Sequence, residues 1–158
     1  MSNQRYAPEF KEEAVRNTLY VRTMSFILAV LSCCLTSPAH ASEPTPSAQS
    51  TVLAWLNVVD AGHYDRSWTD TSAAFQAKVS QTKWITLAGK ARKPLGPLKR
   101  RELLGAAYED ELPRAGTGDY IIFQFQSKFA RKPKAVETVT VVLENGAWRI
   151  AGYFVRNG

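Results

Sequence analysis

The sequence predicts an α+β domain in which N-terminal helices pack on a curved four-stranded antiparallel sheet. Three observations indicate this fold. Apolar residues repeat at three and four residues from residue 49 to about residue 93, which is typical of helices. After Pro97 apolar and polar residues alternate, which is typical of strands. One face of these strands is apolar and the other is polar, so we expect the preceding helices to cover one side of the sheet.

The helical part divides into three or four helices. The apolar face of the first helix is expected to consist of Val52, Leu53, Leu56, Val59 and, less regularly, Trp55. Gly62 ends this helix. A second stretch covers 64–79 and is expected to break near Asp70 and Thr71, one of which caps the part that follows. The last helix ends before Pro94 and carries Trp84, Ile85 and Leu87.

Four strands follow the helices. They are predicted over 99–108, over 119–129, over 138–143 and after the turn at Asn145-Gly146, a pair typical of a type I′ hairpin. The apolar face of the second strand consists of Ile121, Phe123, Phe125 and Phe129. The apolar face of the last strand is expected to consist of Trp148, Ile150 and Phe154. This order of elements resembles the cone-shaped folds typified by nuclear transport factor two and ketosteroid isomerase, and the cystatin-like roll.

An export signal precedes this domain. Phe26–Leu35 is an apolar run of about ten residues, far short of the roughly 20 that a membrane-spanning helix needs. Ala39 and Ala41 supply the small side chains that signal peptidase recognises. We therefore expect a signal peptide over 24–41, cleaved near Ala41, and a periplasmic or secreted product.

Residues 42–50 are expected to be a linker, and residues 51–158 a single domain. Both cysteines lie in the apolar run, so the product cleaved near Ala41 has no thiol. The alternative is a lipoprotein, because Val-Leu-Ser-Cys ending at Cys33 resembles a lipobox. Lipidation of Cys33 would then anchor the protein to a membrane.

The segment before the export signal has a different origin. Met1–Arg16 resembles the opening of the helix-turn-helix protein encoded by the first frame of many insertion-sequence transposases, through Pro-Glu-Phe-Lys and the Ala-Val pair. The turn and the recognition helix that would read DNA do not follow. We therefore interpret 1–23 as a fusion scar or a misplaced start, with Val21 or Met24 as the natural start.

The domain itself resembles bacterial domain-of-unknown-function family 4019 over about 47–156. The resemblance rests on Trp55-Leu56, Val59-Asp60, Gly62, Tyr64, Ser67-Trp68, Arg92, Leu95-Gly96, Leu112-Pro113, Gly118, Tyr120, Ser127, Phe129, Lys132, Glu137, Trp148 and Gly152-Tyr153-Phe154. It implies an exported single domain and lends no activity and no catalytic residue.

The strongest cluster of ionisable residues in the sequence lies where the first two helices meet. Asp60, His63 and Tyr64 come from this junction, and Tyr120 and Tyr153 from the sheet. We predict these five as ligand-binding residues of a non-enzymatic domain that binds a small apolar ligand or an envelope protein, or associates with itself. The alternative is an isomerase or hydrolase that uses Asp60 or His63 with a tyrosine. A structural role, with Asp60 capping or pairing at the helix junction, is the other interpretation.

Other functions lack sequence support. His63 is the single histidine after Ala41, and no phosphate-binding glycine loop or Gly-x-Ser-x-Gly motif occurs. We expect no cofactor, no metal and no catalytic nucleophile. The segment 78–101 is basic and lacks acidic residues, which suits a solvated surface or an anionic partner. It lacks the interleaved aromatics of a nucleic-acid surface, so we expect no nucleic-acid partner.

Overall fold

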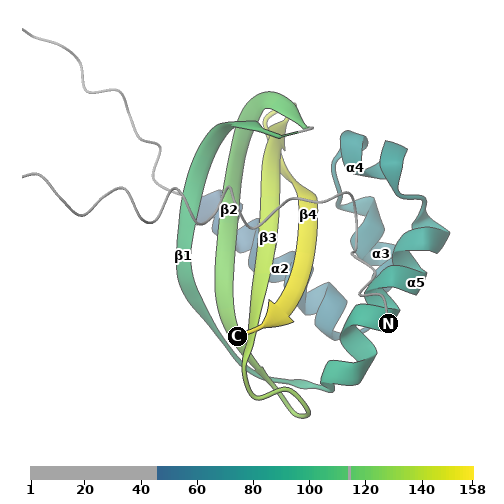
Figure 1. Ribbon diagram of the computed structural model, residues 1–158. Helices are drawn as coiled ribbons and strands as arrows, with labels where there is room; N and C mark the ends of the chain where they lie inside the picture. The colour runs from purple at the N-terminus through teal and green to yellow at the C-terminus, as the bar shows by residue number, and fades with distance from the viewer. Residues whose placement is uncertain (1–45, 114) are drawn as a thin grey trace, which may run out of the picture.

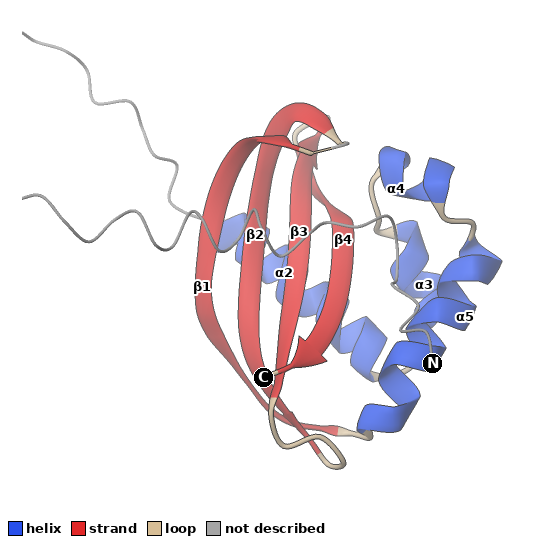
Figure 2. Ribbon diagram, in the orientation of Figure 1, coloured by secondary structure: helices blue, strands red, loops and turns tan. Residues whose placement is uncertain are grey.

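The computed structural model describes residues 46–113 and 115–158, which form helices followed by a sheet (Figure 1, Figure 2). The helical part consists of α2 (Pro46–Asp60), α3 (Tyr64–Thr69), α4 (Ala73–Lys78), α5 (Gln81–Arg92) and the 3₁₀ turn η1 (Lys93–Leu95). The strands are β1 (Leu98–Leu112), β2 (Gly116–Phe129), β3 (Ala135–Glu144) and β4 (Ala147–Asn157). The predicted α+β class is confirmed.

Several sequence predictions lie outside the described residues. They concern the segment 1–23, the signal peptide with Phe26–Leu35, the cleavage site near Ala41 and the lipidation alternative at Cys33. Within the described ranges, no helix has the length and apolar character that crossing a membrane requires.

Helix α2 begins inside the segment predicted as a linker. Its first residue is Pro46, and proline fits the first turn of a helix because the amide there needs no helical partner. The carbonyl of Ser47 accepts hydrogen bonds from the hydroxyls of Ser50 and Thr51, each at 2.9 Å. Ala48 is fully buried. The first described helix therefore starts before residue 51.

The face of α2 that is buried differs from the predicted face by a rotation about the helix axis. Trp55 is 2% exposed, whereas Leu53 is 38% exposed and does not belong to the core, so its assignment to the buried face was wrong. The stripe of Val52, Trp55, Leu56 and Val59 follows the helical period, and Leu53 lies to one side of it. The helix ends at Asp60, and Gly62 takes a positive φ of 81° in the turn that follows.

The second helical stretch breaks where predicted, but neither Asp70 nor Thr71 caps α4. Ser72 is the cap, and its hydroxyl accepts a hydrogen bond from the amide of Phe75 at 3.1 Å. Thr71 instead forms a β-bridge with Ile150, and the amide of Ser72 donates to the carbonyl of Ile150 at 2.8 Å. Because this backbone pairs with β4, the cap lies one residue later.

The sheet is an antiparallel meander in the order β1-β2-β3-β4. The predicted apolar face of β2 is confirmed, because Ile121, Phe123, Phe125 and Phe129 are each at most 1% exposed. The predicted turn between β3 and β4 is confirmed as well. Asn145 has a φ of 51° and Gly146 a φ of 76°, which are the positive angles that a type I′ turn requires.

An irregularity in β4 changes which side chains face the helices. Ile150 pairs with Val141 and Gly152 with Thr140, so one extra residue stands between them. The buried face then continues with Tyr153, which is 7% exposed, and Phe154 turns to the far face and is half-buried. The assignment of Phe154 to the core face was therefore wrong.

The core lies between the helices and the near face of the sheet. Figure 1 shows α2 crossing behind the strands and α3, α4 and α5 gathered beyond β4. Trp55 packs against Tyr153 with ring centroids 5.3 Å apart and against Trp84 at 6.0 Å. Phe75 meets Trp84 edge-on at 5.5 Å. These rings bury large apolar areas and fill the space between the two layers.

The far face of the sheet is less polar than predicted. Leu112, Tyr120, Ile122 and Val142 form a second buried cluster there, with Ala115 and Ala151 against it. Thr138 and Thr140 of β3 are each 5% exposed. Since β3 is an inner strand, its short side chains are flanked by those of β2 and β4. The expectation of a sheet covered on one side only was therefore incomplete.

Candidate functional site

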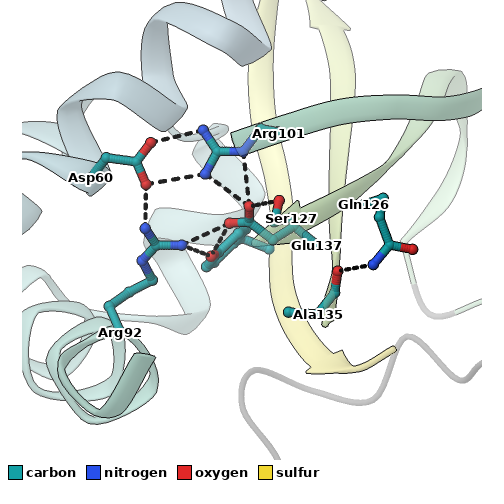
Figure 3. Close-up of polar contacts among 8 residues, drawn as sticks. Asp60, Arg92, Arg101, Gln126, Ser127, Ala135 and Glu137 are labelled. Atoms are coloured by element: carbon teal, nitrogen blue, oxygen red, sulfur yellow. Dashed lines mark hydrogen bonds and ion pairs between the residues drawn. The ribbon is translucent and has the colours of Figure 1, made fainter. Parts of the chain in front are cut away.

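Six polar side chains converge where the ends of α2 and α5 meet the sheet, and we call them the polar cluster. They are Asp60 of α2, Arg92 of α5, Arg101 of β1, Ser127 of β2, Glu137 of β3 and Tyr153 of β4. Figure 3 shows both guanidinium groups between the carboxylate of Asp60 and that of Glu137. The cluster therefore ties two helices to all four strands.

Glu137 is the centre of the polar cluster, and its side chain is fully buried. Its Oε1 accepts from Nη1 of Arg92 and from the hydroxyl of Tyr153, each at 2.7 Å. Its Oε2 accepts from Nε of Arg101 at 2.8 Å and from the hydroxyl of Ser127. Both oxygens thus carry two donors, which is the condition under which a buried carboxylate is tolerated.

Asp60 closes the cluster at the C-terminal end of α2. Its Oδ2 accepts from Nη1 of Arg101 at 2.7 Å, and its Oδ1 accepts from Nη2 of Arg101 at 3.0 Å and from Nη2 of Arg92. The bidentate geometry suits the planar guanidinium. The Asp60 side chain is 16% exposed, whereas those of Arg92 and Arg101 are 5% and 7% exposed. Two positive and two negative charges therefore balance in a site that opens slightly at Asp60.

Arg92 is held from two further directions. Its guanidinium carbon lies 4.5 Å from the centre of the Phe129 ring, a cation–π contact. It is also the last residue of α5, where a positive charge faces the negative end of the helix dipole. Burial lowers the pKa of Arg92, but Tyr153, Glu137 and Asp60 raise it by more, so the net pKa is raised. Arg92 therefore stays charged despite its burial.

The hydroxyl of Tyr153 accepts from Arg92 at 3.0 Å and donates to Glu137. Burial raises the pKa of Tyr153 well above its ordinary value of 10, and Glu137 raises it further against the opposing effect of Arg92. The neutral phenol is therefore favoured in the folded protein throughout the neutral range. A proton donor of this kind stabilises the Glu137 carboxylate and does not ionise near neutral pH.

The stability of the protein at alkaline pH should depend on the phenol of Tyr153. The pKa of Tyr153 is higher in the folded protein than in the unfolded chain. The stabilisation that this residue gives the fold is therefore fully present below about pH 10 and is lost as the pH rises through the folded pKa. We expect the free energy of unfolding to fall above about pH 10. A Tyr153→Phe variant should be less stable than the native protein at neutral pH, but its free energy of unfolding should fall less as the pH rises. Urea denaturation across this range tests it, and parallel curves for the two proteins would contradict the assignment.

The five residues that the sequence predicted as ligand-binding do not all lie together in the structure. Asp60 and Tyr153 meet in the polar cluster, both against Arg92. Tyr64 is half-buried beside them, and its pKa is raised by burial, lowered by Arg92 and raised by Asp60. His63 is exposed, and its side chain makes no capping hydrogen bond to α3. Tyr120 lies in the far-face cluster, away from the others.

Sequence reasoning placed four members of the polar cluster elsewhere. Arg92 and Arg101 were counted with the basic segment 78–101, and Ser127 and Glu137 entered only through the family resemblance. A signal for Glu137 was present in the strand pattern. Ala135, Glu137, Val139 and Val141 share one face of β3, so a carboxylate stands on an otherwise apolar face. A charge at such a position needs a buried partner of opposite charge.

A separate depression of about 340 Å³ lies where α3 and α4 meet the turn between β3 and β4. It is lined by Thr69, Thr71, Ala73, Gln76, Glu144, Asn145, Ala147 and Arg149. Glu144 accepts a hydrogen bond from the amide of Ala73 at 3.1 Å across it. None of the five predicted ligand-binding residues lines this depression. Within residues 46–113 and 115–158, no group of three or more His, Cys, Asp or Glu side chains is placed to hold a metal ion.

Residues 51–153 match the model of the family described as "Protein of unknown function (DUF4019)". No curated protein matches the sequence. The match covers α2 from its second turn to the middle of β4 and includes every member of the polar cluster.

Proposed function

Since the chain belongs to this family, whose description names no activity, we propose from its geometry that it is an exported, non-enzymatic domain that binds an acidic envelope protein. The observation that carries this proposal is a concentration of positive charge at one end of the molecule, which we call the basic pole. It consists of Lys90, Lys93, Lys99, Arg100, Lys128, Arg131, Lys132 and Lys134.

The basic pole is assembled from two stretches that are distant in sequence, 90–100 and 128–134. The end of α5 with η1, the start of β1 and the connection between β2 and β3 meet at the lower end of the molecule in Figure 1. The amide of Arg131 donates to the carbonyl of Leu95 at 2.9 Å, and its Nε donates to the carbonyl of Pro94 at 3.2 Å. These bonds fix the connection against η1. The fold thus brings two basic stretches of the sequence together, which favours an acidic partner.

The interior offers less support for the predicted apolar ligand. Trp55, Trp84 and Phe123 are each at most 4% exposed and occupy the space between helices and sheet. The carboxylates of the polar cluster are saturated by arginine, serine and tyrosine donors. The neutral phenol of Tyr153 and the paired Asp60 likewise suit a structural role better than acid–base chemistry. We therefore assign binding to the surface.

The location of the protein rests on the export signal in the sequence. The apolar run Phe26–Leu35 and the small residues before Ala41 support cleavage, and residues 42–158 contain no cysteine. N-terminal sequencing of the protein recovered from the periplasm or medium tests this. A mature N-terminus near Ser42 supports export by cleavage, a lipidated Cys33 supports the anchored form, and an intact chain in the cytosol refutes both.

The basic pole can be tested with immobilised polyglutamate as an acidic probe. A Lys132→Glu, Lys134→Glu double variant should bind roughly tenfold more weakly at low salt, and the binding of the native protein should fall as salt rises. The matched control is Arg66→Glu with Lys83→Glu, which changes the net charge equally on exposed helical positions. If both double variants lose the same affinity, net charge alone governs binding and the basic pole is not a site.

A further inference from the structure

Strand β1 forms one edge of the sheet, and its outer side pairs with no other strand among the described residues. Figure 2 shows it as the strand farthest from α3, α4 and α5. Apolar side chains gather on this edge, because Leu103, Leu104 and Tyr108 are 42%, 56% and 37% exposed. An open edge with exposed apolar side chains is a template for another strand.

The two ends of β1 carry opposite charges. Lys99 and Arg100 lie at the start, and Asp110 and Glu111 lie at the end, with the apolar stretch around Gly105 between them. If two copies pair in antiparallel fashion with each Gly105 opposite the other, Lys99 faces Glu111 and Arg100 faces Asp110, twice over. Opposite charges directly across a strand pair are stabilising.

We propose that β1 pairs with β1 of a second copy of this chain about a two-fold axis through Gly105, which joins two sheets into one. This antiparallel arrangement brings the basic end of each copy against the acidic end of the other, whereas a parallel pair would align like charges. A two-fold contact uses the same surface on both copies and closes, so the assembly stops at a dimer.

The backbone of β1 fits this arrangement. Gly105 is exposed and carries no side chain, and the space where one would stand is open, so a second strand meets no side chain of this residue at the axis. The strand has register shifts that skip Lys99, Leu104 and Asp110. One shift lies near each end and one beside the centre, and each bends the strand locally. Such shifts bend an edge strand and restrict which strands can pair with it.

Charge reversal gives a test that folding defects cannot mimic. Variant A carries Lys99→Glu and Arg100→Glu, and variant B carries Asp110→Lys and Glu111→Lys. In a dimer of two copies of the same variant, like charges face each other across the strand pair. We therefore expect a dimer dissociation constant at least roughly tenfold above that of the native protein. A mixture of A and B restores opposite charges at both ends and should form a heterodimer. Analytical ultracentrifugation of the purified protein and of the mixture measures these states.

The matched control is Arg66→Glu with Lys83→Glu, which makes the charge change of variant A on α3 and α5 and should remain dimeric. A monomeric native protein at all concentrations, or dimers that A and B leave unchanged, would overturn the proposal. Failure of the A and B mixture to associate would overturn it too. The inference goes beyond the basic pole, whose test uses Lys132 and Lys134, so the two can fail separately.

Discussion

A Glu137→Gln variant should be less stable than the native protein by about 3–5 kcal/mol, the cost expected when one partner of a buried ion pair is removed. The side chain of Glu137 is fully buried, and it is the acceptor for Arg92, Arg101 and Tyr153. Without its charge, two buried guanidinium groups share the single carboxylate of Asp60. Urea denaturation followed by circular dichroism at neutral pH measures the free energy of unfolding.

The control for this prediction is an ion pair at the surface. Arg100 and Glu102 are paired through side chains that are 71% and 52% exposed, so Glu102→Gln should change stability by no more than about 0.5 kcal/mol. Adding Arg101→Met to Glu137→Gln removes the one uncompensated positive charge and leaves Arg92 paired with Asp60. The loss of stability in the double variant should therefore be smaller than the sum of the losses in the two single variants. Additive effects, or equal losses at Glu102 and Glu137, would show that the polar cluster does not act as a unit.

Local pattern was sufficient for much of the fold. The alternation around Phe123, the Asn145-Gly146 turn and the change of period after Pro97 depend on neighbours in sequence, and each agrees with the structure. The exceptions depend on contacts between distant segments. The cap moved to Ser72 because the backbone before it pairs with β4, and Tyr153 replaced Phe154 because of an extra residue in the strand.

The candidate site was harder to predict because its members come from six elements. Asp60 and Tyr153 were named as site residues, but nothing near them in sequence shows that they share Arg92. Arg92 and Arg101 lie in a stretch rich in lysine, where solvation is the ordinary expectation. Their burial follows from Glu137, whose inward position on an apolar strand face was the readable signal. The same tertiary contacts leave the remaining basic residues of this stretch at the surface.

A Trp55→Ala variant should lose about 3–5 kcal/mol of stability, because it removes the largest side chain that links α2 to the sheet. Trp55 is 2% exposed, contacts the rings of Trp84 and Tyr153, and donates its indole N–H to the carbonyl of Ser67 at 2.8 Å. Trp55→Phe keeps much of the apolar volume but leaves that carbonyl without its donor, so its cost should be intermediate.

A Leu53→Ala variant on the same helix is the control, because it shortens an apolar side chain that is not buried. Leu53 is 38% exposed, so its loss should cost less than about 1 kcal/mol, whereas the helical pattern alone ranks Leu53 above Trp55 as a core residue. Thermal and urea denaturation, followed by circular dichroism so that the loss of a tryptophan does not change the signal, compare the variants. A larger cost for Leu53→Ala than for Trp55→Ala would mean that α2 presents a different face to the sheet. It would also move Asp60 away from Arg101, because α2 carries Asp60 as well as Leu53 and Trp55, and the polar cluster could not form as described.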